Sequence, residues 1–109
     1  MDSLFSVKDK VIVITGAGGV LCGTMAVSLA KAGAKIAVLD LNEEAAYNIA
    51  KQINVDNGQA LAVKCNVLEK QSLETAKDEI NSQFGNIDVL INGAGGNKTI
   101  EEYESRIFF

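Results

Sequence analysis

The sequence predicts an α/β fold built on a doubly wound parallel sheet. Short apolar runs, rich in β-branched residues, alternate along the chain with longer segments whose apolar residues recur at helical spacing. When each strand is followed by a helix, the next strand is reached by a right-handed crossover and pairs in parallel. The chain has 109 residues and no repeat, linker or low-complexity tract. Residues 1–109 are therefore expected to form a single domain.

Four apolar runs are the expected strands. The run at residues 11–14 is a continuous stretch of valine and isoleucine, which is typical of a strand buried on both faces. Three further runs have the same character, although the third is weaker. They lie at residues 35–39, 60–63 and 87–91.

Three segments between these strands have the pattern of helices, at residues 21–32, 43–55 and 69–84. The second opens with two glutamates, which are favoured at a helix N-terminus. Gly33, Gly58 and Gly85 are expected to end the three helices in the same way, as C-terminal caps. Thr99 and Glu102 fit a capping box, so a fourth helix is expected to begin near residue 99.

Composition excludes several classes of function. Lys and Arg total 10 against 14 for Asp and Glu, so the chain lacks the basic surface that nucleic acid requires. Histidine is absent, which excludes Ser-His and Cys-His pairs and histidine metal sites, and no metal is expected. No apolar run approaches the ~20 residues of a membrane helix, and the N-terminus does not resemble a signal peptide. The expected location is the cytoplasm, without nucleic-acid or membrane partners.

A glycine-rich turn follows the first strand. The segment 15–23 reads TGAGGVLCG and leads directly into a helix. Glycines at Gly16 and Gly19 would let the backbone turn sharply and approach a pyrophosphate, which the helix N-terminus would then stabilise. Asp40 ends the second strand, 24 residues after Gly16. Its carboxylate can accept both ribose hydroxyls and repel a 2′-phosphate, and neither Gly19 nor Leu41 supplies a cation, so NAD is expected over NADP.

Residues 7–96 resemble the N-terminal half of a short-chain dehydrogenase/reductase. The resemblance rests on the Thr15-Gly16 turn, on Asp40, on Asn66-Val67 after the third strand, and on the NGAG segment 92–95 after the fourth. It implies a Rossmann-like sheet of strand order 3-2-1-4. It also implies a dinucleotide cofactor, NAD, a small-molecule substrate in the complete enzyme, and a homo-oligomer. The segments 18–22 and 95–97 are similar to a subgroup that acts on sugar acids, the D-mannonate oxidoreductase (fructuronate reductase) type.

Four positions depart from the usual pattern of that family. Its second and third turn glycines align with Val20 and Cys22. Where the family has an aspartate after the third strand, this chain has Asn66, whose side-chain carbonyl can still accept a hydrogen bond from an adenine amine. Where the family has a second asparagine after the fourth strand, this chain has Gly93. Carried over position by position, the resemblance implies a set of cofactor-binding residues: Gly16, Gly19, Val20, Leu21, Asp40, Leu41, Asn66, Val67, Asn92, Gly93 and Ala94.

The catalytic residues of the family are not found in this sequence. The family uses a serine and a Tyr-x-x-x-Lys pair, with the tyrosine as general acid and base. Tyr103 is followed four residues later by Ile107 rather than lysine. Tyr47 and Lys51 match by letter, but they are expected beside Asp40 on the wrong side of the cofactor, so we assign no catalytic residue.

Two hypotheses about function follow. The chain is expected to be the cofactor-binding part of an NAD-dependent oxidoreductase that transfers hydride to or from a sugar acid. The alternative is a non-catalytic dinucleotide-binding module, or a truncated product without activity. The two cysteines, Cys22 and Cys65, are expected as small packing residues, and a disulfide is not expected because a strand should lie between them.

Overall fold

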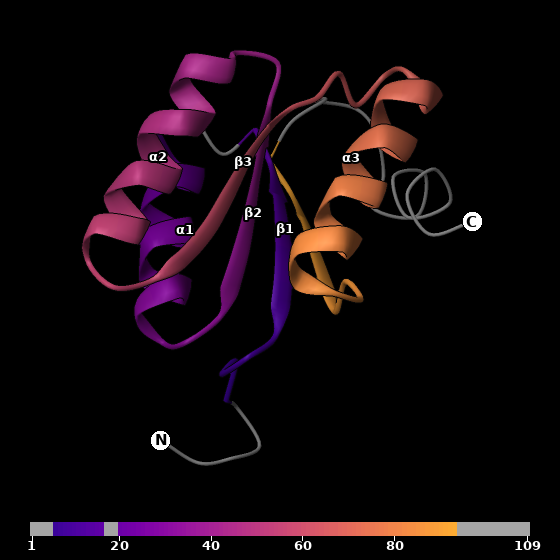
Figure 1. Ribbon diagram of the computed structural model, residues 1–109. Coiled ribbons are helices and arrows are strands. Elements are labelled where there is room, and N and C mark those ends of the chain that lie inside the picture. The colour runs from indigo at the N-terminus through magenta and orange to yellow at the C-terminus, as the bar shows by residue number, and fades with distance from the viewer. Residues whose placement is uncertain (1–5, 17–19, 94–109) are drawn as a thin grey trace.

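The computed structural model describes residues 6–16 and 20–93. Four parallel strands form one sheet in the order β3-β2-β1-β4, and a helix connects each strand to the next along the chain (Figure 1). This confirms the predicted α/β fold and strand order. The elements are β1 (Val11–Thr15), α1 (Val20–Lys31), β2 (Lys35–Asp40), α2 (Glu43–Val55), β3 (Gln59–Lys64), α3 (Lys70–Phe84) and β4 (Val89–Asn92).

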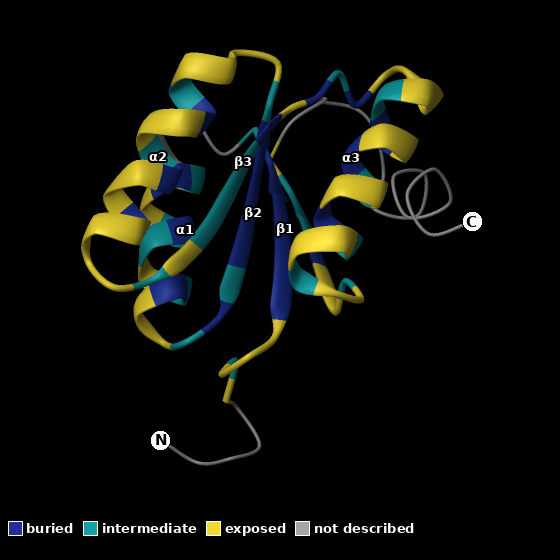
Figure 2. Ribbon diagram, in the orientation of Figure 1, coloured by how far each residue is buried: buried dark blue, intermediate teal, exposed yellow. Residues whose placement is uncertain are grey.

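Helices cover both faces of the sheet. In Figure 1, α1 and α2 lie on one side and α3 lies on the other. Alternate residues of β1 point to the two faces. Ile12 and Ile14 therefore pack into the core beneath α1 and α2, whereas Val11 and Val13 pack into the core beneath α3. All five residues of β1 are buried, as the dark blue central strand in Figure 2 shows, because this strand has a neighbour on each edge and a layer on each face.

The helix ends confirm two of the three glycine caps and correct the third. Gly33 and Gly85 have φ angles of 100° and 89°, in the left-handed region that favours glycine. After α2, however, the left-handed residue is Asn57, with a φ of 65°. Gly58 is required for a steric reason instead, because a Cβ there would lie 2.6 Å from Ile53 Cγ2 and 3.0 Å from the Ile53 carbonyl oxygen.

Strand β4 begins at Val89, two residues later than the apolar run predicts. Asp88 explains the difference. Its amide donates to the Val11 carbonyl at 2.9 Å, and its carboxylate accepts from the Val11 amide, also at 2.9 Å. The side chain thus replaces the backbone partner that would continue the ladder. The helix predicted from residue 99 lies outside the described residues, and none of the described helices is long and apolar enough to cross a membrane.

The contact of Gly58 with Ile53 predicts the effect of adding one methyl group. Gly58→Ala should lower the free energy of unfolding by about 1–3 kcal/mol, because the Cβ has to displace a buried side chain and a backbone carbonyl. Chemical denaturation measures this. Gln59→Ala, at the exposed next residue, is the control. Equal stability of the two variants would contradict the steric role of Gly58.

Candidate functional site

The carboxyl ends of β1, β2 and β3 meet at one edge of the sheet, where they surround a hollow of about 210 Å³. In open parallel sheets this edge is the usual place for a ligand. Five of the residues predicted to bind cofactor line the hollow together with three residues that were not predicted. The lining consists of Gly16, Leu39, Asp40, Leu41, Cys65, Asn66, Val67 and Leu68.

Gly16 forms the turn that leaves β1. Its φ is 67°, which side chains rarely adopt, and its amide donates to the Leu39 carbonyl at 2.8 Å. The bond fixes the start of the glycine-rich turn against the end of β2. Gly16 and Asp40 therefore border the same hollow.

Asp40 ends β2 and is held in place by the start of α2. Its Oδ1 accepts from the Asn42 amide at 2.9 Å, and Asn42 in turn accepts from the Ala45 amide at 3.1 Å as the N-cap of the helix. The cap and the carboxylate thus form one short network. Asp40 is half-buried at the edge of the hollow, whereas the next residue, Leu41, is 62% exposed.

Asn66 follows β3, and both ends of its amide are engaged. Its Oδ1 accepts from the Leu68 amide at 3.0 Å, and its Nδ2 donates to Glu69 Oε1 at 3.1 Å. Its backbone amide donates to Ser72 Oγ at 2.9 Å. These bonds orient the amide with its oxygen toward the 67–68 turn. A carbonyl oxygen has two lone pairs, so Oδ1 keeps the capacity to accept a second hydrogen bond.

Cys65 lies beneath this turn and is 2% exposed. Burial raises the pKa of its thiol, and the nearby Glu69 carboxylate raises it further, while a hydrogen bond with Ser72 acts in the opposite direction. The thiol is therefore neutral at pH 7 and adds an apolar surface to the hollow. Both cysteines are free. Cys65 belongs to the core beneath α3 and Cys22 packs against the opposite core, so the two thiols lie on opposite faces of the sheet. The predicted intervening strand, β2, also lies between the strands that they follow.

A second group of predicted residues lies where β1 and β4 end. Thr15 is completely buried, and its hydroxyl donates to Asn92 Oδ1 at 3.0 Å. The Gly93 amide donates to the Thr15 carbonyl at 3.0 Å and to the Thr15 hydroxyl oxygen at 3.2 Å. The backbone of Val20 and Leu21 begins α1 beyond the turn. Gly19 and Ala94 lie outside the described residues.

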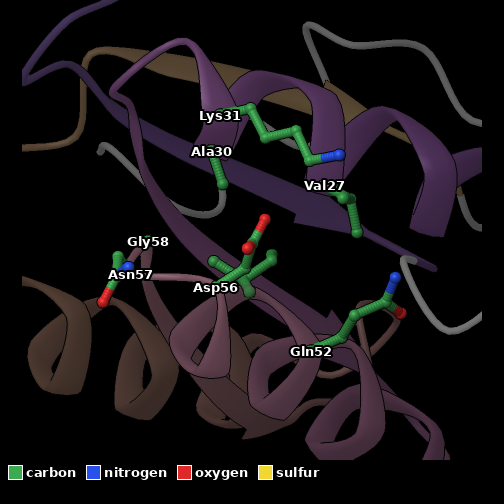
Figure 3. Close-up of a pocket in the computed structure, with 8 residues that line it drawn as sticks. Val27, Ala30, Lys31, Gln52, Asp56, Asn57 and Gly58 are labelled. Atoms are coloured by element: carbon green, nitrogen blue, oxygen red, sulfur yellow. The ribbon is translucent and has the colours of Figure 1, made fainter.

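A larger hollow, of about 340 Å³, lies elsewhere, between the last turns of α1 and α2. Figure 3 shows Val27 and Lys31 of α1 across it from Gln52 and Asp56. It is formed by helix C-termini rather than strand ends, and it contains none of the predicted site residues. Tyr47 and Lys51 border a different hollow along β3, and neither lines the one at Asp40.

Sequence reasoning missed three residues of the 210 Å³ hollow. Leu39 and Leu68 are neighbours in sequence of predicted residues, and Cys65 directly precedes Asn66. Leu68, like Leu41, is 62% exposed, which is unusual for so large an apolar side chain. An apolar residue following an expected turn was the available signal for Leu68. Thr15 was noted only as part of the turn, and its bond to Asn92 depends on a contact between residues far apart in sequence.

The buried hydroxyl of Thr15 yields a prediction about stability. Thr15→Val keeps the shape of the side chain but removes the donor to Asn92, which should cost about 1–2 kcal/mol of unfolding free energy. Thr75→Val is the matched control, because the Thr75 hydroxyl bonds only to its own exposed helix turn, at Gln71. We expect that control to change stability by less than about 0.5 kcal/mol. Equal unfolding midpoints for the two variants would refute the role assigned to Thr15.

Comparison with known proteins places this geometry in a family. An uncharacterized oxidoreductase of Haemophilus influenzae is 52% identical over 92 residues, covering 84% of this chain and 32% of the relative. An uncharacterized oxidoreductase of Bacillus subtilis is 47% identical over 104 residues, covering 91% of this chain and 37% of the relative. The chain thus spans about a third of the length of these curated relatives.

A solved structure shares the fold described here. It is the crystal structure of a provisionally assigned D-mannonate oxidoreductase from Haemophilus influenza with bound NAD. It is 52% identical, with a TM-score of 0.81, over 85% of this chain and 33% of that one. The sequence profile of the short chain dehydrogenase family matches residues 10–108. The chain therefore belongs to the short-chain dehydrogenase/reductase family of oxidoreductases, of which it contains an N-terminal part.

Proposed function

We propose that residues 1–109 form the NAD-binding part of an oxidoreductase that transfers hydride between the cofactor and a sugar acid. The observation that carries this proposal is the shared lining of one hollow by Gly16, Asp40 and Asn66. The similar Haemophilus structure is described as holding NAD and as a D-mannonate oxidoreductase, which supports both the cofactor and the substrate class. We further propose that the complete enzyme is a homo-oligomer.

The hollow suits the adenosine half of the cofactor. Its volume of about 210 Å³ is below the ~300–1,000 Å³ of pockets that enclose a whole ligand, so it would take one part of a dinucleotide. The Asp40 carboxylate would accept from both ribose hydroxyls. Leu41 and Leu68, which line the hollow, offer exposed apolar surface for the base, and binding would cover it. The Asn66 carbonyl would accept from the adenine amine, with Val67 beneath it.

The pyrophosphate would bind at the start of α1. The amide groups of its first turn are directed outward, and a helix N-terminus favours an anion. The first turn of α1 carries no acidic side chain, whereas α2 begins with Glu43 and Glu44 and is capped by Asn42. Three helices start at this edge, and α3 has Glu69 at its N-cap position, so α1 is the one suited to a phosphate. Gly19, Val20 and Leu21 would contribute through their backbone.

The nicotinamide half would extend toward the end of β4. Asn92, Gly93 and Ala94 would border the nicotinamide ribose, with Asn92 fixed by the Thr15 hydroxyl. When bound, NAD supplies the nicotinamide C4 atom that accepts the hydride of an alcohol. The contribution of these residues is to hold and orient the cofactor, and no residue of this chain is assigned the proton transfer.

Cofactor preference provides the main test. Asp40 should favour NAD, because its carboxylate binds a 2′-hydroxyl and repels a 2′-phosphate. The double variant Asp40→Ala/Leu41→Arg should bind NAD about tenfold or more weakly than wild type, and it should bind NADP more tightly than NAD. Calorimetric titration of the wild-type chain and the double variant with both cofactors measures this.

Asp56→Ala is the control for the cofactor test, because it removes an equal charge at the other end of α2. It should leave the preference for NAD unchanged. Wild-type protein that binds NADP as tightly as NAD, or that binds neither, would refute the proposed cofactor site.

The substrate class can be tested with a chimera. The matching third of the Haemophilus relative would be replaced by this chain, and NADH formation would be followed with D-mannonate and other sugar acids. We expect sugar-acid oxidation to be retained within about tenfold of the unaltered relative, because the cofactor site is transferred as a unit. An inactive chimera that still folds and binds NAD would show that this chain cannot support the reaction.

A further inference from the structure

Cys22 and the glycine at position 93 compete for one space. Gly93 lies two residues after Ile91, whose side chain packs against the core beneath α1 and α2. A Cβ on Gly93 would overlap the Sγ of Cys22 and would lie 2.7 Å from the Thr15 carbonyl oxygen. The φ of Gly93 is not in the left-handed region, so a side chain is excluded there by space and not by backbone conformation.

This contact links two departures from the family pattern. The resemblance aligns Cys22 with a glycine of the family and Gly93 with an asparagine. In this chain the larger of the two residues is therefore at position 22, in the helix, whereas in the family it is at position 93, after the strand. Cys22 lies in the first turn of α1, where the pyrophosphate is expected, and Gly93 follows the last residue of β4, where the nicotinamide ribose is expected. The exchange therefore occurs between the two parts of the proposed site.

We propose that Cys22 is a positioning residue for the cofactor: its side chain, packed over Gly93, sets the end of β4 relative to the first turn of α1. The proposal rests on the proposed function. The Gly93 amide bonds to Thr15, and Thr15 bonds to Asn92, so a displacement of residue 93 would be transmitted to both neighbours. A side chain at position 93 would require both removal of the side chain at position 22 and a shift of the Thr15 carbonyl group.

The pair makes a specific prediction about the two halves of NAD. Gly93→Asn should weaken NAD binding by about tenfold, because the new side chain has to push β4 away from α1. AMP fills the adenosine hollow, which neither residue lines, and its phosphate reaches the start of α1, but it lacks the nicotinamide ribose expected at the end of β4. Its dissociation constant for Gly93→Asn should therefore stay within about twofold of wild type. Adding Cys22→Gly to Gly93→Asn removes the overlap with Sγ and leaves the contact with the Thr15 carbonyl oxygen, so it should recover part of the lost affinity, with NAD bound at least threefold more tightly than by Gly93→Asn alone.

The experiment measures dissociation constants for NAD and AMP by titration on the 109-residue chain, for wild type, C22G, G93N and C22G/G93N. Ser82→Asn is the control, because Ser82 is exposed near the C-terminal end of α3 and lines neither part of the proposed site. The control should bind both ligands as wild type does. Gly93→Ala is the second variant if Gly93→Asn does not fold, and it should be rescued by Cys22→Gly in the same way.

Three results would overturn the proposal. The first is that the Gly93→Asn variant binds NAD as tightly as wild type does. The second is a double variant that binds no better than Gly93→Asn. The third is a parallel loss of NAD and AMP affinity, which would indicate a general loss of structure. If wild-type protein binds AMP but not NAD, this inference fails while the adenosine hollow stands, and if it binds neither, the proposed function fails as well.

Discussion

The complete burial of β1 is the constraint on which the rest of the structure depends. This strand pairs with β2 on one edge and β4 on the other, and its two faces contribute to separate cores. Its last residue, Thr15, is the only buried polar side chain among the described residues. A buried hydroxyl without a partner is costly, and this one bonds to Asn92 and Gly93. The requirement that stabilises the centre of the sheet therefore also fixes the strand ends at which a cofactor would bind.

Two of the three helices that begin at the carboxyl edge of the sheet are used differently. The N-terminus of α2 is satisfied within the chain by the side chain of Asn42, and that residue also holds Asp40. The first turn of α1 follows a glycine turn and contains no acid that would occupy its amides. One helix start thus serves the structure by orienting a carboxylate, while the other remains suited to an anion. This division explains how one edge can present both an acceptor for hydroxyl groups and a site for phosphate.

Variation within the family pattern is accommodated by local compensation. Asparagine in place of aspartate after β3 is anchored by Leu68 and Glu69, so the amide oxygen keeps a defined direction despite the lost charge. Glycine in place of asparagine after β4 coincides with a larger side chain at Cys22. At Asn66 the neighbouring residues orient the amide so that its oxygen can act as the acceptor. At Gly93 the side chain of Cys22 occupies the space beside the glycine. A departure from a motif is therefore best judged together with the residues that contact it.

The sequence by itself determined the element order, because strand and helix periodicities are local properties of the chain. It also placed Gly16, Asp40 and Asn66 at the ends of successive strands, and the carboxyl ends of parallel strands necessarily meet at one edge. Gly33 and Gly85 were predictable as helix caps since their backbone conformation is set by near neighbours.

Only the tertiary structure decided where contacts between distant segments override these preferences. Gly58 is required by the volume of Ile53, the start of β4 is set by the bond between Asp88 and Val11, and Leu68 and Cys65 join the hollow through the turn after β3. The contact of Cys22 with Gly93 joins residues 71 positions apart. The spacing of apolar residues along a chain indicates which elements form and which faces they bury. Whether two residues far apart in sequence compete for the same space depends on how the sheet brings their elements together.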